Sequence, residues 1–234
     1  MAAEAPLTPA AAEALRKVLA RLATERASVS SVRKGPRAWD IHVLDSLSGL
    51  EVADLSEAGR IADVGSGSGF PGIALAAALP QARVDLIESV GRKCAFMRQA
   101  AEEAQITNAT VVCARSEDHA AGAGRDAYDV VTARAVGRLA TLAELASPLL
   151  RPGGVLVAWK GRRDPEEELE MRRAEAEVEM QSEEVIEVAP FPESRNRHLH
   201  VLRKTGATPA RLPRRAGLAK RRPLGARGQR QAEG

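Results

Sequence analysis

A glycine-rich stretch between two short apolar runs constrains the fold of this chain more than any other feature. The first apolar run, 61–64, ends in glycines at positions 65, 67 and 69, and an apolar helical stretch follows at 73–79. Glycine allows a sharp turn and a close approach of backbone to a ligand. A second apolar run, 84–87, ends in Glu88, whose carboxylate can accept hydrogen bonds from ribose hydroxyls. This order of elements predicts a site for a nucleotide-type cofactor.

The spacing of the glycines distinguishes between two kinds of cofactor. A dinucleotide fold has G-x-G-x-x-G directly after the strand. If this pattern starts at Gly65, its last position is Phe70 and not glycine. If it starts at Gly67, all three glycines match, but the pattern begins two residues too far from the strand end. The Asp-Val-Gly-x-Gly-x-Gly loop of S-adenosylmethionine (SAM) enzymes places Asp63 at the strand end and Gly65, Gly67 and Gly69 in register. SAM has no pyrophosphate, so it needs no helix N-terminus shaped for phosphate. We therefore predict a SAM site, with a dinucleotide site and an ordinary structural turn as alternatives.

The rest of the chain predicts a doubly wound α/β sheet. Apolar runs that indicate strands alternate with helical stretches from residue 60 onward, and this alternation implies a parallel sheet. The strands are expected at 61–64, 84–87, 109–113, 128–132, 154–159, 184–189 and 197–203, and the helices near 72–79, 90–104, 136–150 and 164–181. Seven strands with a hairpin-like final pair fit the Rossmann-like sheet of class I SAM-dependent methyltransferases.

The 234 residues are expected to form one domain with two appendages. Residues 1–55 should be an N-terminal helical segment that packs on the core, with helices at 8–26 and 39–50. Residues 56–205 should be the SAM-binding core. Residues 206–234 form a basic tail, which we expect to be mobile because it is rich in charge and proline.

The net charge of +3 hides an acidic segment and a basic one. Residues 162–187 carry eleven acids and four arginines, whereas the last 34 residues carry ten basic residues and one acid. Basic runs of this kind are typical of segments that bind nucleic acid. The acidic helix near 164–181 is expected to point to solvent.

Other features exclude several classes of protein. No apolar run approaches the roughly 18 residues of a membrane span, and the N-terminus lacks a signal-peptide pattern, so we expect a cytoplasmic protein with no membrane partner. Cys94 and Cys113 are expected to be small buried residues in a reducing compartment rather than metal ligands. His198 and His200 share a strand face, but no third ligand is evident, so no metal is predicted.

Several segments together carry a resemblance to a known family. They lie at 39–46, 63–72, 88–93, 133–135, 160–161, 197–199 and 213–217. In these segments the chain resembles the bacterial 16S rRNA (guanine(527)-N(7))-methyltransferase family, also called the glucose-inhibited division protein B family. The glycine loop alone is generic to SAM enzymes, whereas the segment around His42, Asp45 and Ser46 and the extension to Phe70 and Gly72 are more specific. The chain departs from many members at 27–37, where an Asn-Leu-Thr segment is missing.

This resemblance implies an activity, a cofactor and a partner. The family transfers a methyl group from SAM to N7 of a guanine in 16S rRNA, so the partner would be that rRNA, in the small ribosomal subunit or in its assembly intermediate. The chain is expected to act as a monomer. The cofactor residues of the family carry over to Gly65, Phe70, Ser116, Glu117 and Arg134.

The absence of certain motifs is consistent with transfer to N7. Methylation of an exocyclic amine usually uses an Asn/Asp-Pro-Pro-aromatic element after the fourth strand, where this chain has Thr-Ala-Arg-Ala at 132–135. Methylation of a pyrimidine carbon needs a nucleophilic cysteine near that strand. Guanine N7 carries an in-plane lone pair and no proton, so it needs alignment rather than a general base, and alignment can supply about 7–11 kcal/mol.

Three basic residues could donate to O6 of the guanine beside N7, namely Arg134, Arg197 and Lys160. Arg134 and Arg197 are our candidate catalytic residues, in a positioning role, although each of the three could instead form a structural ion pair. His42, Asp45 and Ser46 are candidate RNA contacts. The alternatives are that His42 packs in the core and that Asp45 and Ser46 cap a turn.

Aromatic and basic side chains elsewhere could also contact RNA. Trp39 and Trp159 could stack on bases, but burial in the core is the favoured reading. Arg214 and Arg215 in the tail are candidate phosphate contacts, and a solvated tail without a role is the alternative. Removal of the tail after Gly206 is expected to weaken RNA binding and to leave SAM affinity intact.

Three other functions remain open at this stage. The chain could be a SAM-dependent methyltransferase of another RNA, a protein or a small molecule. It could be a nicotinamide-dependent oxidoreductase, or a non-catalytic RNA-binding protein with a relic cofactor pocket.

Overall fold

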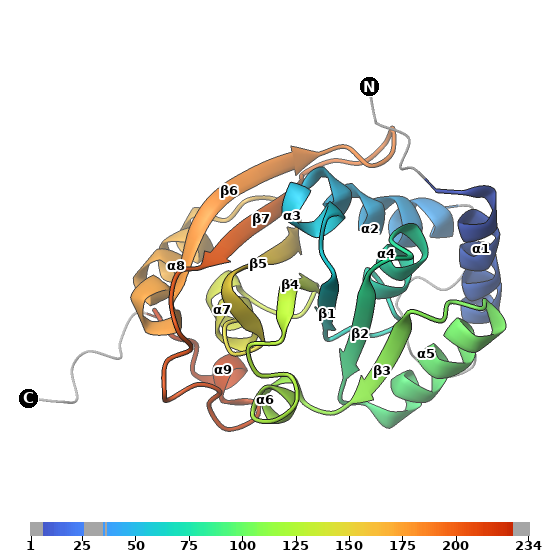
Figure 1. Ribbon diagram of the computed structural model, residues 1–234. Helices are drawn as coiled ribbons and strands as arrows, with labels where there is room; N and C mark the ends of the chain where they lie inside the picture. Colours follow the sequence, from blue (N-terminus) through green and yellow to red (C-terminus); the bar gives the residue numbers. More distant parts are fainter. Residues whose placement is uncertain (1–6, 26–34, 36, 227–234) are drawn as a thin grey trace, which may run out of the picture.

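The computed structural model describes residues 7–25, 35 and 37–226 (Figure 1). Within this part of the chain, one seven-stranded sheet forms the centre of the molecule, in the order β3-β2-β1-β4-β5-β7-β6. Strands β1 to β5 pair in parallel, and β7 runs antiparallel to both β5 and β6. The strands are β1 (Arg60–Val64), β2 (Arg83–Glu88), β3 (Ala109–Cys113), β4 (Tyr128–Arg134), β5 (Leu150–Lys160), β6 (Met180–Val188) and β7 (Arg197–Lys204). The predicted class I methyltransferase fold is therefore confirmed.

Helices cover both faces of the sheet and create two hydrophobic cores. One face is covered by α1 (Pro9–Thr24), α4 (Gly72–Ala78) and α5 (Gly91–Glu103), and the other by α6 (Ser116–Ala120), α7 (Leu139–Ala146), α8 (Pro165–Val178) and α9 (Leu218–Arg221). Neighbouring strand residues alternate between the cores, since Val155 packs in the first core and Leu156 in the second. Among the helices of the described residues, none combines the length and apolar character needed to cross a bilayer.

The N-terminal segment forms both predicted helices, and the second contains a π-helical turn that the sequence pattern did not predict. Helix α1 begins after Thr8, whose hydroxyl accepts a hydrogen bond from the Ala11 N–H at 3.1 Å. The expected helix at 39–50 is present as a continuous helical stretch with an irregular hydrogen-bond pattern. It consists of a π-helical turn η1 (Asp40–Leu44), α2 (Asp45–Leu47) and a 3-10 turn η2 (Ser48–Glu51), and α3 (Ala53–Ser56) follows after the extended Val52. The wide π turn ends at Asp45, next to the carboxyl end of β4.

Helix α8 ends earlier than its sequence pattern predicts. The acidic pattern continues to residue 181, but Glu179 adopts a left-handed conformation with φ of 51° and ends the helix at Val178. Strand β6 then begins at Met180, four residues before the predicted start. Two acids of α8 are also buried, Glu167 and Glu170, so the helix does not present all of its charge to solvent.

The basic segment after residue 205 is ordered over its described part. Leu212 and Leu224 are buried in the second core, Ala219 is buried as well, and α9 packs against α7. The expectation of a mobile segment is therefore wrong for 206–226, because widely spaced apolar residues anchor it between the basic ones. Residues 227–234 lie outside the described part. The division into three units at 55 and 205 stays a prediction.

Candidate functional site

The glycine loop after β1 has the backbone conformation that its sequence predicts. Gly65, Gly67 and Gly69 have φ values of 69°, 60° and 95°, in the region where other residues are strained. A Cβ atom on Gly65 would lie 2.7 Å from Cγ2 of Val136, so the space beside this glycine must stay free of a side chain.

The side chain of Asp63 connects the end of β1 to the start of α4 and to β4. Its Oδ2 accepts a hydrogen bond from the Gly72 N–H at 3.1 Å, and its Oδ1 accepts one from the Thr132 hydroxyl at 2.9 Å. Burial raises the pKa of Asp63, and the hydrogen bonds from Thr132, Ser66 and Gly72 oppose this rise. Asp63 thus fixes the start of α4 against β1, while its predicted direct contact with a cofactor stays untested.

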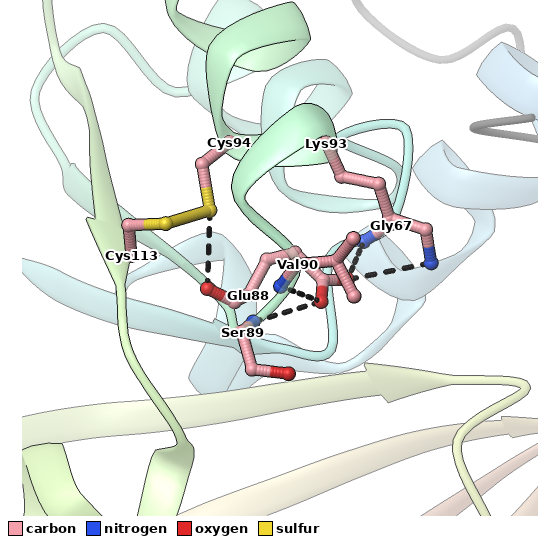
Figure 2. Close-up of a disulfide and its surroundings, with 7 residues drawn as sticks. All are labelled: Gly67, Glu88, Ser89, Val90, Lys93, Cys94 and Cys113. Carbon is pink, nitrogen blue, oxygen red and sulfur yellow. Dashed lines mark hydrogen bonds and ion pairs between the residues drawn. A yellow bond between two sulfur atoms is a disulfide. The ribbon is translucent and has the colours of Figure 1, made fainter. Parts of the chain in front are cut away.

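Glu88 lies at the end of β2 and faces the same loop (Figure 2). Its Oε1 accepts hydrogen bonds from the N–H groups of Ser89 and Val90 at 2.8 and 2.9 Å, and its Oε2 accepts one from the Gly67 N–H at 3.2 Å. Lys93 Nζ lies 3.6 Å from Oε2. These donors fix the orientation of a carboxylate that is only 6% exposed.

A cavity of about 660 Å³ opens between Gly65 and Glu88; we call it the first cavity. Ser116 and Glu117, at the start of α6, line it as well. Four of the predicted cofactor residues therefore meet in one cavity.

The C-terminal segment, residues 206–226, forms a wall of the first cavity that the sequence did not predict. Gly217, Ala219 and Lys220 line the cavity, and the Gly217 N–H donates to Glu117 Oε1 at 2.6 Å. Figure 1 shows α9 beside α6, in agreement with this contact. The buried apolar residues of the segment were the signal that could have revealed its place. The expectation that SAM affinity is independent of the tail conflicts with this arrangement.

A second hollow, of about 560 Å³, lies at the carboxyl ends of β4 and β5 and at the start of β7; we call it the second cavity. It is lined by Asp45, Arg134, Lys160, Arg197 and Trp159, among others. Ligands of open α/β sheets bind at such strand ends. The chain thus brings four of the predicted site residues together here from segments far apart in the sequence.

Arg134 connects the second cavity to the N-terminal segment. Its Nη1 donates to Asp45 Oδ2 at 2.9 Å, to the Ile41 carbonyl at 3.2 Å and to the Ser46 hydroxyl at 3.3 Å. Arg197 Nε lies 3.7 Å from the other carboxylate oxygen, Asp45 Oδ1. The buried Asp45 carboxylate therefore lies between two guanidinium groups.

Several other predicted RNA contacts have partners within the protein. Lys160 Nζ donates to Glu167 Oε1 at 2.6 Å and to the Gly137 carbonyl at 3.1 Å. His42 is buried, and its ring packs against the ring of Phe70 with centroids 4.9 Å apart. Trp159 is buried and donates from Nε1 to the Asp45 carbonyl at 2.7 Å. For these residues the structure agrees with the packed or ion-paired alternative.

The two tail arginines differ in their surroundings. Arg214 forms two hydrogen bonds of 2.5 Å with the buried carboxylate of Glu144, whereas Arg215 is exposed. The expected phosphate contact of Arg214 is therefore not supported, because its guanidinium is already occupied. Arg215 remains a candidate.

The two cysteines form a disulfide, so the expectation of two reduced thiols is wrong (Figure 2). Their Cα atoms are 5.8 Å apart, although the residues are separated by 19 positions. The register of the sheet explains the pairing. Cys113 lies beside Glu88 on the neighbouring strand. The first turn of α5 brings Cys94 Sγ to 3.2 Å from the carbonyl oxygen of the same Glu88. Among the described residues, no cluster of three or more His, Cys, Asp or Glu side chains could hold a metal ion.

Comparison with known proteins gives a family match over most of the chain. The family model described as rRNA small subunit methyltransferase G matches residues 10–200. A ribosomal RNA small subunit methyltransferase G from Rubrobacter xylanophilus is 46% identical over 204 residues, which cover 85% of this chain and 78% of that protein. The protein of the same name from Deinococcus radiodurans is 40% identical over 210 residues, covering 88% and 82%.

Solved structures with little sequence identity share the fold. An O-methyltransferase from Bacillus cereus in complex with SAH has a TM-score of 0.55 and 18% identity, covering 85% of this chain and 92% of that chain. Fibrillarin from Aeropyrum pernix, with bound S-adenosyl-L-methionine, has a TM-score of 0.53 and 16% identity, covering 68% and 72%. These likenesses extend to the arrangement of sheet and helices alone.

Proposed function

Because this chain belongs to the rRNA small subunit methyltransferase G family, we propose that it transfers a methyl group from SAM to N7 of a guanine in 16S rRNA. One observation supports this most strongly: the two cavities are lined by consecutive residues of the same short segment, 134–136. Val136 lines the first cavity, and Arg134 and Ala135 line the second. A donor in one cavity and an acceptor in the other would then meet at this short segment.

The residues of the first cavity fit SAM. Gly65 leaves bare backbone beside Val136, Glu88 offers its carboxylate to ribose hydroxyls, and Ser116 and Glu117 lie where the adenine ring would be held. When bound, SAM supplies a methyl group on a positively charged sulfur. The protein is left with the tasks of holding the base, aligning N7 and keeping water out.

The second cavity fits a purine base that needs no general base. Guanine N7 has a free lone pair, so its alignment with the methyl carbon is sufficient, and alignment of this kind supplies about 7–11 kcal/mol. Arg197 at the rim can donate to guanine O6. Arg134 takes a positioning role instead, because its Nη1 is already bonded to Asp45 and Ser46.

We also propose that the substrate is 16S rRNA in the small subunit or an assembly intermediate, bound by a monomeric enzyme in the cytoplasm. Exposed basic residues of the C-terminal segment support the contact with RNA: Arg215, Lys220, Arg221 and Arg222 are exposed, and Lys220 also lines the first cavity. Neutralisation of phosphates by such residues makes binding weaken with rising salt.

Methyl transfer from tritiated SAM to small-subunit RNA from a strain that lacks the gene tests the proposed function. The wild-type protein should restore one 7-methylguanosine, mapped by mass spectrometry. Gly65→Val should reduce transfer below detection, because its side chain would collide with Val136. Gly122→Ala is the matched control, since its nearest neighbouring atom is 4.0 Å away. Transfer by Gly65→Val, or no 7-methylguanosine with wild type, would contradict the proposal.

A further inference from the structure

We propose that Asp45 selects guanine by accepting hydrogen bonds from its N1–H and its exocyclic amine, an inference that rests on the proposed function. The carboxylate lines the second cavity, and its side chain is 5% exposed. One oxygen, Oδ2, is bonded to Arg134. The other, Oδ1, is buried and has no hydrogen-bond partner within the described part of the protein. A buried carboxylate oxygen without a donor is costly, so a ligand that supplies one is expected.

The surroundings of Asp45 keep this acceptor in place before any base arrives. Trp159 Nε1 and the Ser48 hydroxyl both donate to the Asp45 carbonyl, each at 2.7 Å, and Arg134 fixes Oδ2. The whole residue is therefore held from its backbone to one carboxylate oxygen. Such preorganisation favours recognition because little freedom is lost on binding.

Arg197 covers the free oxygen without satisfying it. Its Nε is 3.7 Å from Oδ1, too far for a hydrogen bond, and its side chain is 38% exposed. It can therefore give way to a base and donate to O6 from the rim. A purely structural role as the counter-ion of Arg134 would need only Oδ2, and it would leave Oδ1 unexplained.

The chemistry of the two purines explains the selectivity. Both have N7, but guanine presents donors at N1 and at the exocyclic amine on C2, whereas adenine presents an acceptor at N1. A fixed carboxylate accepts from guanine and repels adenine. Enzymes that act on an extruded base read this edge by hydrogen bonds in the same way.

The carboxylate also faces the charge that the reaction creates. As the N7–carbon bond forms, the carbon–sulfur bond breaks and its electron pair returns to sulfur. The positive charge thereby moves from sulfur to the purine ring. Asp45 beside N1–H would stabilise that cation, which is the form of electrostatic assistance that fixed charges give in closed sites.

RNA with inosine at the target position tests this inference, because inosine lacks only the C2 amine. Transfer of tritiated methyl to the guanine and inosine RNAs would be measured at equal SAM saturation. Loss of one good base contact predicts that wild type methylates the inosine RNA roughly five- to a hundredfold more slowly. Asp45→Asn should be slower on guanine RNA and should have a guanine-to-inosine ratio near one.

Two further measurements separate Asp45 from a general defect. Asp54→Asn, a variant of an aspartate that pairs with Arg203 away from the cavity, should keep the wild-type ratio, and SAM affinity by calorimetry should be retained in Asp45→Asn. If wild type methylates both RNAs equally, or Asp45→Asn keeps the wild-type ratio, the inference is overturned while the proposed function stands. Absence of transfer to guanine RNA by wild type would instead refute the proposed function. The wild-type ratio needs no variant, so the test survives a failure of Asp45→Asn to fold.

Discussion

Arg214 and Arg215 are neighbours of the same chemical type with different environments. Arg214 is 16% exposed and holds a glutamate that is 2% exposed, Glu144 of α7. Arg215 is exposed on the surface of the same segment. The first therefore anchors the C-terminal segment, and the second is available to a partner outside the protein.

This difference predicts opposite results for two alanine substitutions. Arg214→Ala leaves Glu144 buried and unpaired, which should lower the free energy of unfolding by roughly 3–5 kcal/mol and weaken SAM binding. Arg215→Ala should change neither quantity. It should lower the slope of RNA affinity against salt by about one. Denaturant titration, calorimetry and RNA binding at several salt concentrations measure these effects; equal SAM affinity in wild type and Arg214→Ala would contradict the role of the anchor.

Among single residues, the sequence predicts the roles of those whose environment is set by neighbouring positions in the chain. Gly65 and Glu88 could be identified because the loop and the strand end define their environment within a few positions. Arg214 could not, because its partner is 70 residues away in the sequence. Asp45 was a candidate RNA contact, but its contacts with Arg134 and Trp159 could not be predicted, because they depend on the folded sheet.

The elements around Glu88 are linked by the disulfide between α5 and the end of β3. Cys94 lies in the first turn of α5 and is buried. Cys113 is the last residue of the edge strand β3 and is exposed. The bond therefore connects the edge strand β3 to the helix that follows Glu88.

Loss of this bond should destabilise the fold. Cys113→Ser removes a crosslink that closes a loop of about 20 residues, so the free energy of unfolding should fall by about 2–4 kcal/mol. Denaturant titration with and without dithiothreitol measures the effect. The reductant should destabilise wild type by a similar amount and leave Cys113→Ser unchanged. An identical midpoint for reduced and oxidised wild type would rule out a stabilising crosslink.

Elements with a clear period were predictable, and irregular ones were not. The five parallel strands follow from apolar runs and their spacing. The helix expected at 39–50 is present, but its π turn and the buried contacts of Asp45 and Ser46 were not predicted, because no periodicity encodes them. Disulfide pairing was missed because it depends on strand register.

The whole molecule has two cores on either side of one sheet, and the burial of His200 on β7 links the stability of this fold to pH. Burial lowers the pKa of His200, while the nearby carboxylate of Glu168 raises it in part. Between this lowered pKa and the ordinary value of about 6.5, the unfolded chain holds a proton that the folded chain does not. Acid therefore favours unfolding over this interval.

Stability should consequently fall as the pH decreases from 7 through 6 and below. The contribution of this histidine has a slope of at most about 1.4 kcal/mol per pH unit. His200→Gln should flatten the curve of unfolding free energy against pH. His198→Gln, on the same strand but more exposed, should leave more of the slope in place. Parallel curves for wild type and His200→Gln would show that the acid sensitivity arises elsewhere.

The position of the C-terminal segment has a consequence for how the protein is made. All seven strands of the sheet are encoded before residue 205, but Gly217 and Lys220, which complete the cavity wall next to Glu117, are synthesised only after them. A nascent or prematurely terminated chain would thus have its sheet without a closed pocket. Competence for the donor molecule then arrives only after the whole sheet has been translated.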